Sequence, residues 1–550
     1  MSTVPTIADW IRERAADDGT ALLFEDARWS WRELAAEAAA RAALLRSAPA
    51  DPPHVGVLLE NVPDFVFWLA AAALSRSVVV GINPTRRGAE LASDIRATDC
   101  RWIATDRGHR GLLDGLELGI PEERVLVVDD ERGEARLAGY RGAALPRQAA
   151  EPGDLFVLFF TSGTTGTPKA VRCGQGRLAH AGFHLASGFG VAGGVVYQAM
   201  PMFHSNALMA GWSPALAAGA PMALRRRFSA SGFLPDVRRY GATYFNYVGK
   251  PLAYILATPE RPDDADNPLR LGFGNEANPS DVGAFEKRFG CRVVDSYGSS
   301  EGGANVGRTP ETPAEALGRV SEDVRVLDPE TLAETPPARF DAGGRLLNAE
   351  AAIGQIASRS GLRSFEGYYK NPAAEAERVH DGWYWSGDLA YRDEQGFLYF
   401  AGRGHDWLRV DGENFAAAPV EAILLRHPDV MLAAVYAVPD PRVGDQVMAA
   451  VQLRPGARDL AALDAFVRAQ PDLGTKQLPR FLRVTPEMPV TETSKLQKRV
   501  LRAQGWECAD PVFWRPAPGA ALVALGDADR ERIRREFEAH GRAHVLALGC

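Results

Sequence analysis

Apolar, strand-like runs alternate with helix-forming stretches from about residue 30 to residue 400, and this alternation limits the fold strongly. Strands separated by helices form parallel sheets that helices cover on their faces. The Ala-rich segment Glu33–Ala43 is predicted as a helix, because alanine is the strongest helix former. We therefore expect an α/β protein. The clearest predicted strands are Val55–Leu59, Val78–Ile82, Trp102–Thr105, Val125–Val128 and Leu155–Phe160.

The pattern changes near Gly402. Residues 391–404 predict a short hairpin that ends in a Gly-Arg-Gly break. Beyond it, Pro419–Arg426 is predicted as a helix and Val430–Val438 as a strand. We therefore expect a large N-terminal domain of stacked α/β subdomains over residues 1–401, and a smaller α+β domain over residues 402–550.

Charge and cysteine content exclude several classes of protein. The formal net charge is 62 − 70 = −8, which argues against a nucleic-acid-binding surface, since such a surface needs a basic excess. The five cysteines form no Cys-x-x-Cys and no cluster with histidine, so we expect neither a disulfide framework nor a zinc site. Free thiols suit a reducing compartment, and a cytoplasmic location is predicted.

No membrane segment or signal peptide is expected. The longest apolar stretch, Phe65–Ile82, is interrupted by Arg76 and Ser77 and predicts a buried helix followed by a buried strand. The N-terminus contains acidic residues and has no uninterrupted apolar run, unlike a signal peptide.

A hydroxyl-rich loop directly after the strand Leu155–Phe160 predicts a polyphosphate site. Two glycines allow the backbone to approach an anion, hydroxyl groups can donate to it, and Lys169 adds a compact positive charge. It is not the G-x-x-x-x-G-K-[ST] loop, because Pro168 precedes the lysine. A hydroxyl-rich surface turn is the weaker alternative. The candidate phosphate-binding residues are Thr161, Ser162, Gly163, Thr164, Thr165, Gly166 and Lys169.

This loop resembles the phosphate-binding signature of the adenylate-forming superfamily, which contains acyl- and aryl-CoA synthetases, peptide-synthetase adenylation domains and luciferases. Further motifs of that superfamily follow in the same order along essentially the whole chain. They are Met202–Ser205, Asp295–Glu301, Trp385–Asp388, Gly402-Arg403 and Lys495.

The resemblance implies a nucleotide site. Tyr297 would lay its aromatic face on adenine, Asp388 would accept hydrogen bonds from the ribose hydroxyls, and Arg403 would contact ribose or phosphate beside a hinge. Glu301 offers a hard oxygen to Mg²⁺, which usually takes one or two carboxylates together with phosphate oxygens. The other implied nucleotide-binding residues are Gly274, Asn275, Ser296, Gly298, Ser299 and Ser300.

Lys495 resembles the lysine that bridges the attacking carboxylate and the α-phosphate in this superfamily. An ammonium can neutralise charge that develops there without bidentate geometry. Lys498 is the alternative, with a solvated surface charge as its ordinary role. The expected catalytic residues are Lys495, His204 and Glu301, while Gly412 and Glu413 would guide the pantetheine arm of coenzyme A.

Several details resemble one branch, the fatty-acid transport protein and very-long-chain acyl-CoA synthetase group. The hinge reads Gly402-Arg-Gly-His-Asp406 rather than Gly-Arg-x-Asp, and Arg409 stands where a lysine is common. The segment Asp510–Trp514 resembles the C-terminal extension of that branch. The resemblance implies a ligase that uses ATP, Mg²⁺ and coenzyme A in fatty acid metabolism, with residues 402–550 as a mobile lid.

The expected substrate is a long or bulky apolar carboxylic acid. We expect its tunnel to be framed by Phe203, His204, Trp212 and the small residues Gly302–Ala304, because small residues leave volume. Three alternatives stay open at this point: an amino-acid adenylation domain, a chain that performs one half-reaction alone, and a binding protein without activity. The sequence leaves the oligomeric state open, with a homodimer among the assemblies it permits.

Overall fold

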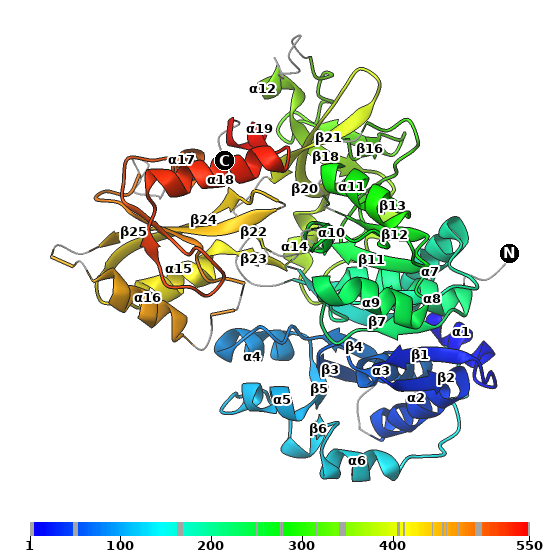
Figure 1. Cartoon of the computed structure of the whole chain (residues 1–550). Coiled ribbons are helices and arrows are strands. Elements are labelled where there is room, and N and C mark those ends of the chain that lie inside the picture. Colours follow the sequence, from blue (N-terminus) through cyan, green and yellow to red (C-terminus); the bar gives the residue numbers. More distant parts are fainter. Residues whose placement is uncertain are drawn as a thin grey trace.

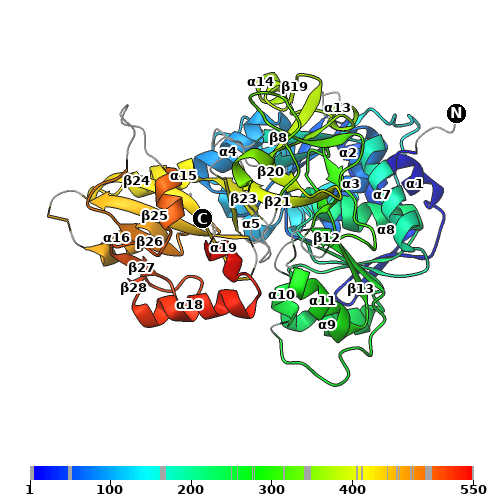
Figure 2. The same cartoon turned by 90° about the horizontal axis from the view of Figure 1, so that it is seen from above.

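The computed structural model describes residues 5–47, 53–161, 169–248, 251–256, 258–275, 277, 279–313, 316–339, 348–403, 407–410, 413–442, 444–453, 456–457, 459–470, 473–474, 476–489 and 498–547. The expected fold class is confirmed: a large N-terminal part of mixed α/β structure is followed by a smaller C-terminal part (Figure 1). Seen from above, strands β24–β28 and helices α15–α19 form a lobe beside the rest of the chain (Figure 2).

The first sheet contains all five strands that the sequence predicts most clearly. Its order is β6-β5-β3-β4-β7-β8, and every pair is parallel except β7 with β8. The strands are β3 (His54–Leu58), β4 (Val78–Gly81), β5 (Cys100–Thr105), β6 (Val125–Val127), β7 (Leu155–Thr161) and β8 (Lys169–Gly174).

The second sheet has the order β13-β12-β11-β9-β10-β1-β2. It is parallel from β13 to β1, and β2 closes it as an antiparallel edge. Its strands are β1 (Thr20–Phe24), β2 (Ala27–Ser30), β9 (Val196–Gln198), β10 (Met222–Leu224), β11 (Tyr244–Val248), β12 (Leu271–Asn275) and β13 (Arg292–Asp295).

One apolar core joins these two sheets through helix α3. Ten consecutive residues of α3, Phe65–Leu74, are buried, as expected for a helix that is apolar on all sides. Side chains from α2, α7 and both sheets pack in the same cluster. The helices of this region are α1 (Ile7–Glu13), α2 (Trp31–Arg46), α3 (Pro63–Ser75), α4 (Gly88–Ala97), α5 (Arg107–Arg110), α6 (Glu131–Ala138), α7 (Gln175–Phe189), α8 (Ser213–Ala218), α9 (Ala230–Tyr240), α10 (Pro251–Leu256) and α11 (Pro279–Phe289); short turns are η1 (Gly111–Leu113), η2 (Glu122–Arg124) and the π-helical η3 (Ala207–Trp212).

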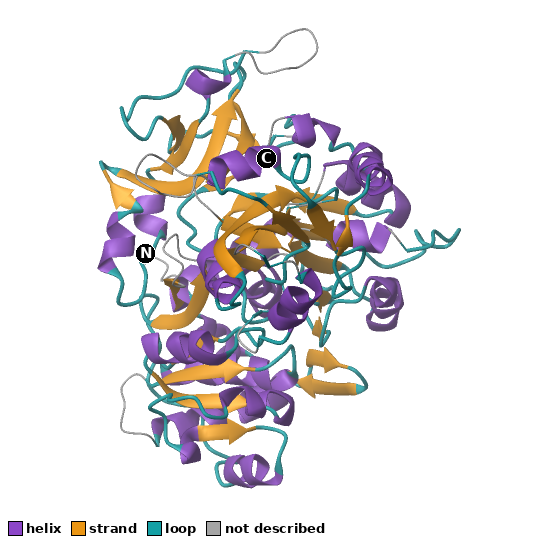
Figure 3. Cartoon of the chain, turned by 90° about the vertical axis from the view of Figure 1, so that its left-hand side faces the viewer, coloured by secondary structure: helices purple, strands orange, loops and turns teal. Residues whose placement is uncertain are grey.

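A third, largely antiparallel sheet follows, in which β20 and β21 form the hairpin that the sequence predicts. Figure 3 shows the strands gathered in separate sheets with helices packed beside them. The elements of this region are β14 (Tyr297–Gly298), β15 (Asn305–Val306), β16 (Gly318–Arg319), β17 (Val324–Leu327), α12 (Ala349–Ala352), β18 (Gly354–Ser358), α13 (Gly361–Ser364), α14 (Pro372–Ala376), β19 (Val379–His380), β20 (Trp383–Arg392) and β21 (Phe397–Arg403).

The C-terminal sheet has the order β24-β25-β26-β27-β28 and carries an apolar cluster on each face. Alternate residues of β24 enter two different apolar clusters: Val435 faces the cluster with α15 and α16, whereas Tyr436 faces the cluster with α17 and α18. The elements are β22 (Trp407–Val410), β23 (Glu413–Ala416), α15 (Ala417–Leu425), β24 (Val430–Pro439), β25 (Asp445–Leu453), α16 (Leu460–Arg468), β26 (Phe481–Val484), α17 (Lys498–Gln504), β27 (Val512–Trp514), β28 (Val523–Ala524), α18 (Asp527–Ala539) and α19 (Ala543–Ala547).

The segment Phe65–Ile82 is the buried helix and buried strand that the sequence predicts, since it spans most of α3 and all of β4. In the part of the chain that the structure describes, no helix is both long enough and apolar enough to cross a bilayer.

Candidate active site

The motif at the end of β13 lies beside the loop at the end of β12. The two strands are parallel, with Gly274 paired to Asp295, and the Ser296 backbone N–H donates to the Gly274 carbonyl over 2.8 Å. A Cβ on Gly274 would lie 2.3 Å from the Tyr247 carbonyl oxygen, so this close approach requires glycine. Sequence positions predicted to flank adenine are therefore neighbours at one edge of the sheet.

Asn275 gives this edge a polar group that suits a nucleotide base. Its side-chain oxygen Oδ1 is buried and has no hydrogen-bond partner among the described residues. A buried acceptor without a donor costs free energy, of about 1–3 kcal/mol. An amino group such as that of adenine would supply the missing donor, so the residues present fit the nucleotide.

Tyr297 and Asp388 come from motifs 91 residues apart and meet directly. The Tyr297 hydroxyl donates to Asp388 Oδ2 over 2.7 Å, and burial, followed by the Asp388 charge, raises the pKa of Tyr297 well above its ordinary value. Asp388 lies within strand β20 rather than in the turn that its Ser-Gly-Asp sequence suggests, and Ser386 Oγ accepts from its backbone N–H. Across the β20–β21 hairpin it pairs with Arg403, so the predicted ribose carboxylate and hinge arginine are adjacent in the backbone.

Glu301 is buried beside Thr161, the residue at which the phosphate loop begins. Its Oε1 accepts hydrogen bonds from the Tyr368 hydroxyl over 3.1 Å and from Thr161 Oγ1 over 3.4 Å. Thr161 pairs with Lys169 across β7 and β8, and Lys169 Nζ contacts the Glu377 carboxylate at 2.8 Å. The two described ends of the loop thus meet beside the predicted magnesium ligand.

Glu301 offers the kind of hard oxygen ligand that magnesium prefers. Among the described residues, no group of three or more His, Cys, Asp or Glu side chains could hold a metal ion. Mg²⁺ needs only one or two carboxylates when phosphates and water complete its shell. Glu301, next to hydroxyl groups and Lys169, fits that requirement.

Ser205 and Ser300 connect the motif that contains His204 to this site. Their hydroxyl oxygens are 2.6 Å apart, and the His204 ring lies 4.3 Å from the Phe203 ring between centroids. The π-helical turn η3 begins at Ala207. Such turns are uncommon and often occur at functional sites.

Three further residues build the site, and the sequence analysis missed them: Arg177, Tyr368 and Arg378. Arg177 Nη2 donates to the Ser300 carbonyl over 2.6 Å, and Arg378 Nη1 donates to the Trp385 carbonyl over 3.2 Å. These arginines hold the turn that carries Glu301 and the strand β20 that carries Asp388. Each of the three residues lies outside the recognised motifs, so no sequence pattern pointed to its role.

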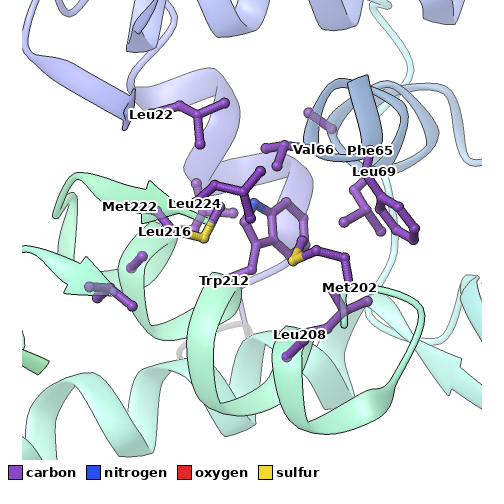
Figure 4. Close-up of a cluster of buried hydrophobic side chains, with 14 of the residues drawn as sticks. Leu22, Phe65, Val66, Leu69, Met202, Leu208, Trp212, Leu216, Met222 and Leu224 are labelled. Atoms are coloured by element: carbon purple, nitrogen blue, oxygen red, sulfur yellow. The ribbon is translucent and has the colours of Figure 1, made fainter. Parts of the chain in front are cut away.

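Two of the residues expected to line the acyl tunnel, Trp212 and Gly303, pack against protein side chains instead. Trp212 is 4% exposed and packs in the apolar core with Val66 of α3, Met202 and Leu224 of β10 (Figure 4). A Cβ on Gly303 would lie 2.2 Å from the Tyr384 ring. The small residues after Glu301 therefore leave room for protein side chains rather than for a substrate.

This packing predicts the result of replacing Gly303 by alanine. We expect a loss of about 1–3 kcal/mol in the free energy of unfolding, the usual cost of overpacking, because Tyr384 is buried and cannot move away. Chemical denaturation measures the loss. Gly307→Ala is the matched control, since a Cβ there meets nothing within 4 Å. Equal stability of the two variants would contradict the packing argument.

Asp295 predicts a pH-dependent effect on stability. Burial raises its pKa to about 6, although the Tyr247 hydroxyl and the Ala277 N–H both donate to its Oδ2. The folded pKa lies above the unfolded value of about 3.9, so the folded protein binds this proton more tightly. The carboxyl therefore stabilises the fold fully below about pH 4, and this contribution is lost as the pH rises through 6.

Asp295→Asn keeps an acceptor for both donors and removes the charge. Relative to the unsubstituted protein, its free energy of unfolding should improve by about 1.4 kcal/mol between about pH 5 and about pH 8. Denaturation at both pH values measures this change. A stability difference that is the same at both would show that Asp295 has an ordinary pKa.

Several predicted site residues lie outside the described residues: Ser162, Gly163, Thr164, Thr165, Gly166, Gly412 and Lys495. Arg403 and Glu413 are described in their backbone alone.

Comparison with known proteins identifies the family. The model of the AMP-binding enzyme family matches residues 9–368, and the model of the AMP-binding enzyme C-terminal domain matches residues 419–495. The chain belongs to the AMP-binding enzyme family. It is an ATP-dependent acid–CoA ligase of the adenylate-forming superfamily, as the motifs predict.

Curated relatives cover nearly the whole chain. A steroid-22-oyl-CoA synthetase of Rhodococcus jostii is 51% identical over 98% of this chain and 99% of its own length. The medium/long-chain-fatty-acid–CoA ligase FadD17 of Mycobacterium marinum is 49% identical over 93% of this chain and 99% of its own. Human long-chain fatty acid transport protein 5 is 31% identical over 82% of this chain and 70% of its own, which agrees with the predicted branch.

The fold matches solved structures of this family. The o-succinylbenzoate CoA synthetase of Bacillus subtilis superposes with a TM-score of 0.75, covering 91% of this chain and 98% of its own, at 22% identity. The C-terminal family model ends at residue 495, before β27 and α18. These later elements of the AMP-binding enzyme add a strand to the C-terminal sheet and cover one of its faces.

Proposed function

We propose that this AMP-binding enzyme activates a long or bulky apolar carboxylic acid as acyl-AMP and transfers the acyl group to coenzyme A. The observation that carries the proposal is the meeting of three motif pairs at one site: Thr161 with Glu301, Tyr297 with Asp388, and Ser205 with Ser300. The names of two relatives refer to a steroid acyl group and to medium- and long-chain fatty acids, which supports an apolar substrate.

The first half-reaction uses the nucleotide side of the site. A carboxylate oxygen of the acid attacks the α-phosphorus of ATP, the bond between the α- and β-phosphates breaks, and pyrophosphate leaves. Tyr297, Asn275 and Asp388 would orient the nucleoside, which lowers the entropic cost of reaching the reactive geometry. Glu301 would hold Mg²⁺, which neutralises phosphate charge, and Lys495 would stabilise the developing charge at the α-phosphate.

The second half-reaction needs a different surface around the same pocket. The sulfur of coenzyme A attacks the acyl carbon, AMP leaves, and the thiol proton passes to solvent. We propose that residues 402–550 act as a lid that rotates near residues 403–406, so that Lys495 withdraws and Gly412 and Glu413 guide the pantetheine. Because β21 runs to Arg403, the pivot would follow directly after the hairpin that carries Asp388.

Purified enzyme tests the proposal with Mg²⁺, ATP, coenzyme A and a panel of acids. The panel holds a steroid side-chain acid, saturated fatty acids of increasing length, acetate and amino acids. We expect AMP release and a thioester, detected by mass spectrometry, with the apolar acids and not with acetate. If the thioester forms only from synthetic acyl-AMP, the chain performs one half-reaction alone. If pyrophosphate exchange occurs only with amino acids, the chain is an amino-acid adenylation domain.

A cytosolic location is also proposed, because the described cysteines Cys100, Cys173, Cys291 and Cys508 are free thiols. The homodimer stays a prediction, which sedimentation velocity of the purified chain tests.

A further inference from the structure

Helix α7 presents two histidines side by side on its solvent-facing surface. His180 and His184 are both exposed, lie one helical turn apart, and have ring centroids separated by 4.2 Å. Phe183 beside them is 54% exposed. The one charged residue of α7 is Arg177, three positions before His180, and its guanidinium is engaged with the Arg172 and Ser300 carbonyls. Within the described part of the chain, neither imidazole forms a hydrogen bond or an ion pair.

Helix α7, which carries this pair, packs closely against its neighbours. The opposite face of α7 buries Leu178, Ala179 and Gly182 against α8 and η3. A Cβ on Gly182 would lie 2.0 Å from Ser213 Oγ, which shows how closely α7 and α8 approach. A ligand that joins the two imidazoles would therefore not have to order the helix first.

The chemistry of such a pair is specific. Imidazole nitrogen in its neutral form binds Zn²⁺, Ni²⁺ and Cu²⁺, and two histidines four positions apart on one helix face can reach the same ion.

We propose that His180 and His184 form a two-histidine site for a borderline divalent transition metal, with water in the remaining coordination positions. Among the described residues no third metal-binding side chain joins them, so the ion would be exchangeable rather than structural. By the usual order of affinities, Cu²⁺ should bind most tightly, and Ni²⁺ and Zn²⁺ less so. This site is independent of the proposed ligase chemistry.

The chain contains its own control for this argument. His540 and His544 have the same spacing in sequence, but α18 ends at Ala539 and α19 begins at Ala543. Gly541 between them has φ +66°, which reverses the chain. His540 Nδ1 also lies 2.7 Å from the Glu536 carbonyl oxygen. The second pair therefore shares the spacing without the continuous helix.

Calorimetric titration of the full-length chain, without a histidine tag, with NiCl₂ tests the site. We expect one site in the unsubstituted protein and a loss in affinity of about 10²-fold in His180→Ala and in His184→Ala, because joining two ligands gives at least that advantage. The double variant His540→Ala/His544→Ala should bind as the unsubstituted protein does. Circular dichroism without metal checks that each variant is folded.

Electron paramagnetic resonance at one equivalent of Cu²⁺ gives a second measurement. The unsubstituted protein should show coupling to two imidazole nitrogens, and His180→Ala should show fewer. Unchanged Ni²⁺ affinity in both single variants, no binding by the unsubstituted protein, or a loss confined to the His540/His544 variant would each overturn the proposal.

Discussion

Replacing Glu301 by glutamine is expected to slow acyl-AMP formation by about 10²–10³, the usual effect of removing a pre-organised electrostatic group. Glutamine has the size of glutamate, and its oxygen can still accept from the Tyr368 and Thr161 hydroxyls. The charge that would hold Mg²⁺ is lost. Pyrophosphate release under single-turnover conditions measures the rate, and a titration with Mg²⁺ should show a raised requirement for the ion.

Tyr368→Phe is the matched variant for this experiment. It removes one hydrogen bond to Glu301 and keeps the carboxylate, so the rate should fall much less, by about tenfold at most. Thermal denaturation checks that both variants are folded. If Glu301→Gln forms acyl-AMP at the unsubstituted rate, another carboxylate must hold the metal.

Lys495→Ala is expected to separate the two half-reactions. Acyl-AMP formation should slow by about 10²–10³, because the ammonium would no longer neutralise charge at the α-phosphate. The same variant should convert supplied acyl-AMP and coenzyme A to the thioester at the unsubstituted rate, since the proposed lid rotation has withdrawn Lys495 by then. Single-turnover assays of each half-reaction measure the two rates. Equal losses in both would mean that the lysine is structural.

Lys498 provides the matched control. Its Nζ forms an ion pair with Glu421 at 2.8 Å, and both side chains are partly buried. Glu421 also accepts from the Val435 N–H, which ties α15 to β24. Lys498→Ala should therefore lower the stability of the C-terminal domain and leave acyl-AMP formation nearly unchanged. The opposite result would transfer the catalytic role from Lys495 to Lys498.

Gly412→Val gives the complementary result for the lid. A bulky side chain would fill the path proposed for pantetheine, so thioester formation should fall while acyl-AMP formation continues. Equal rates of thioester formation in this variant and the unsubstituted chain would place the path elsewhere.

The sequence by itself determined the fold class and, through its motifs, the family. Strands such as Val78–Gly81 are short, apolar and β-branched, so local composition was sufficient to predict them. The family followed from the resemblance of the motifs to those of known enzymes. The buried α3 was also predictable, because a helix that is apolar on every side has to be enclosed.

The tertiary structure alone decided which side chains meet and which spaces are filled. Gly303 accommodates the Tyr384 ring, and Trp212 packs in the core, although their small size or position had suggested an acyl tunnel. Arg177 holds the turn that carries Glu301, Arg378 holds the strand that carries Asp388, and neither arginine lies in a motif. Such contacts join residues far apart in sequence, and their geometry depends on how whole sheets and helices pack rather than on local spacing.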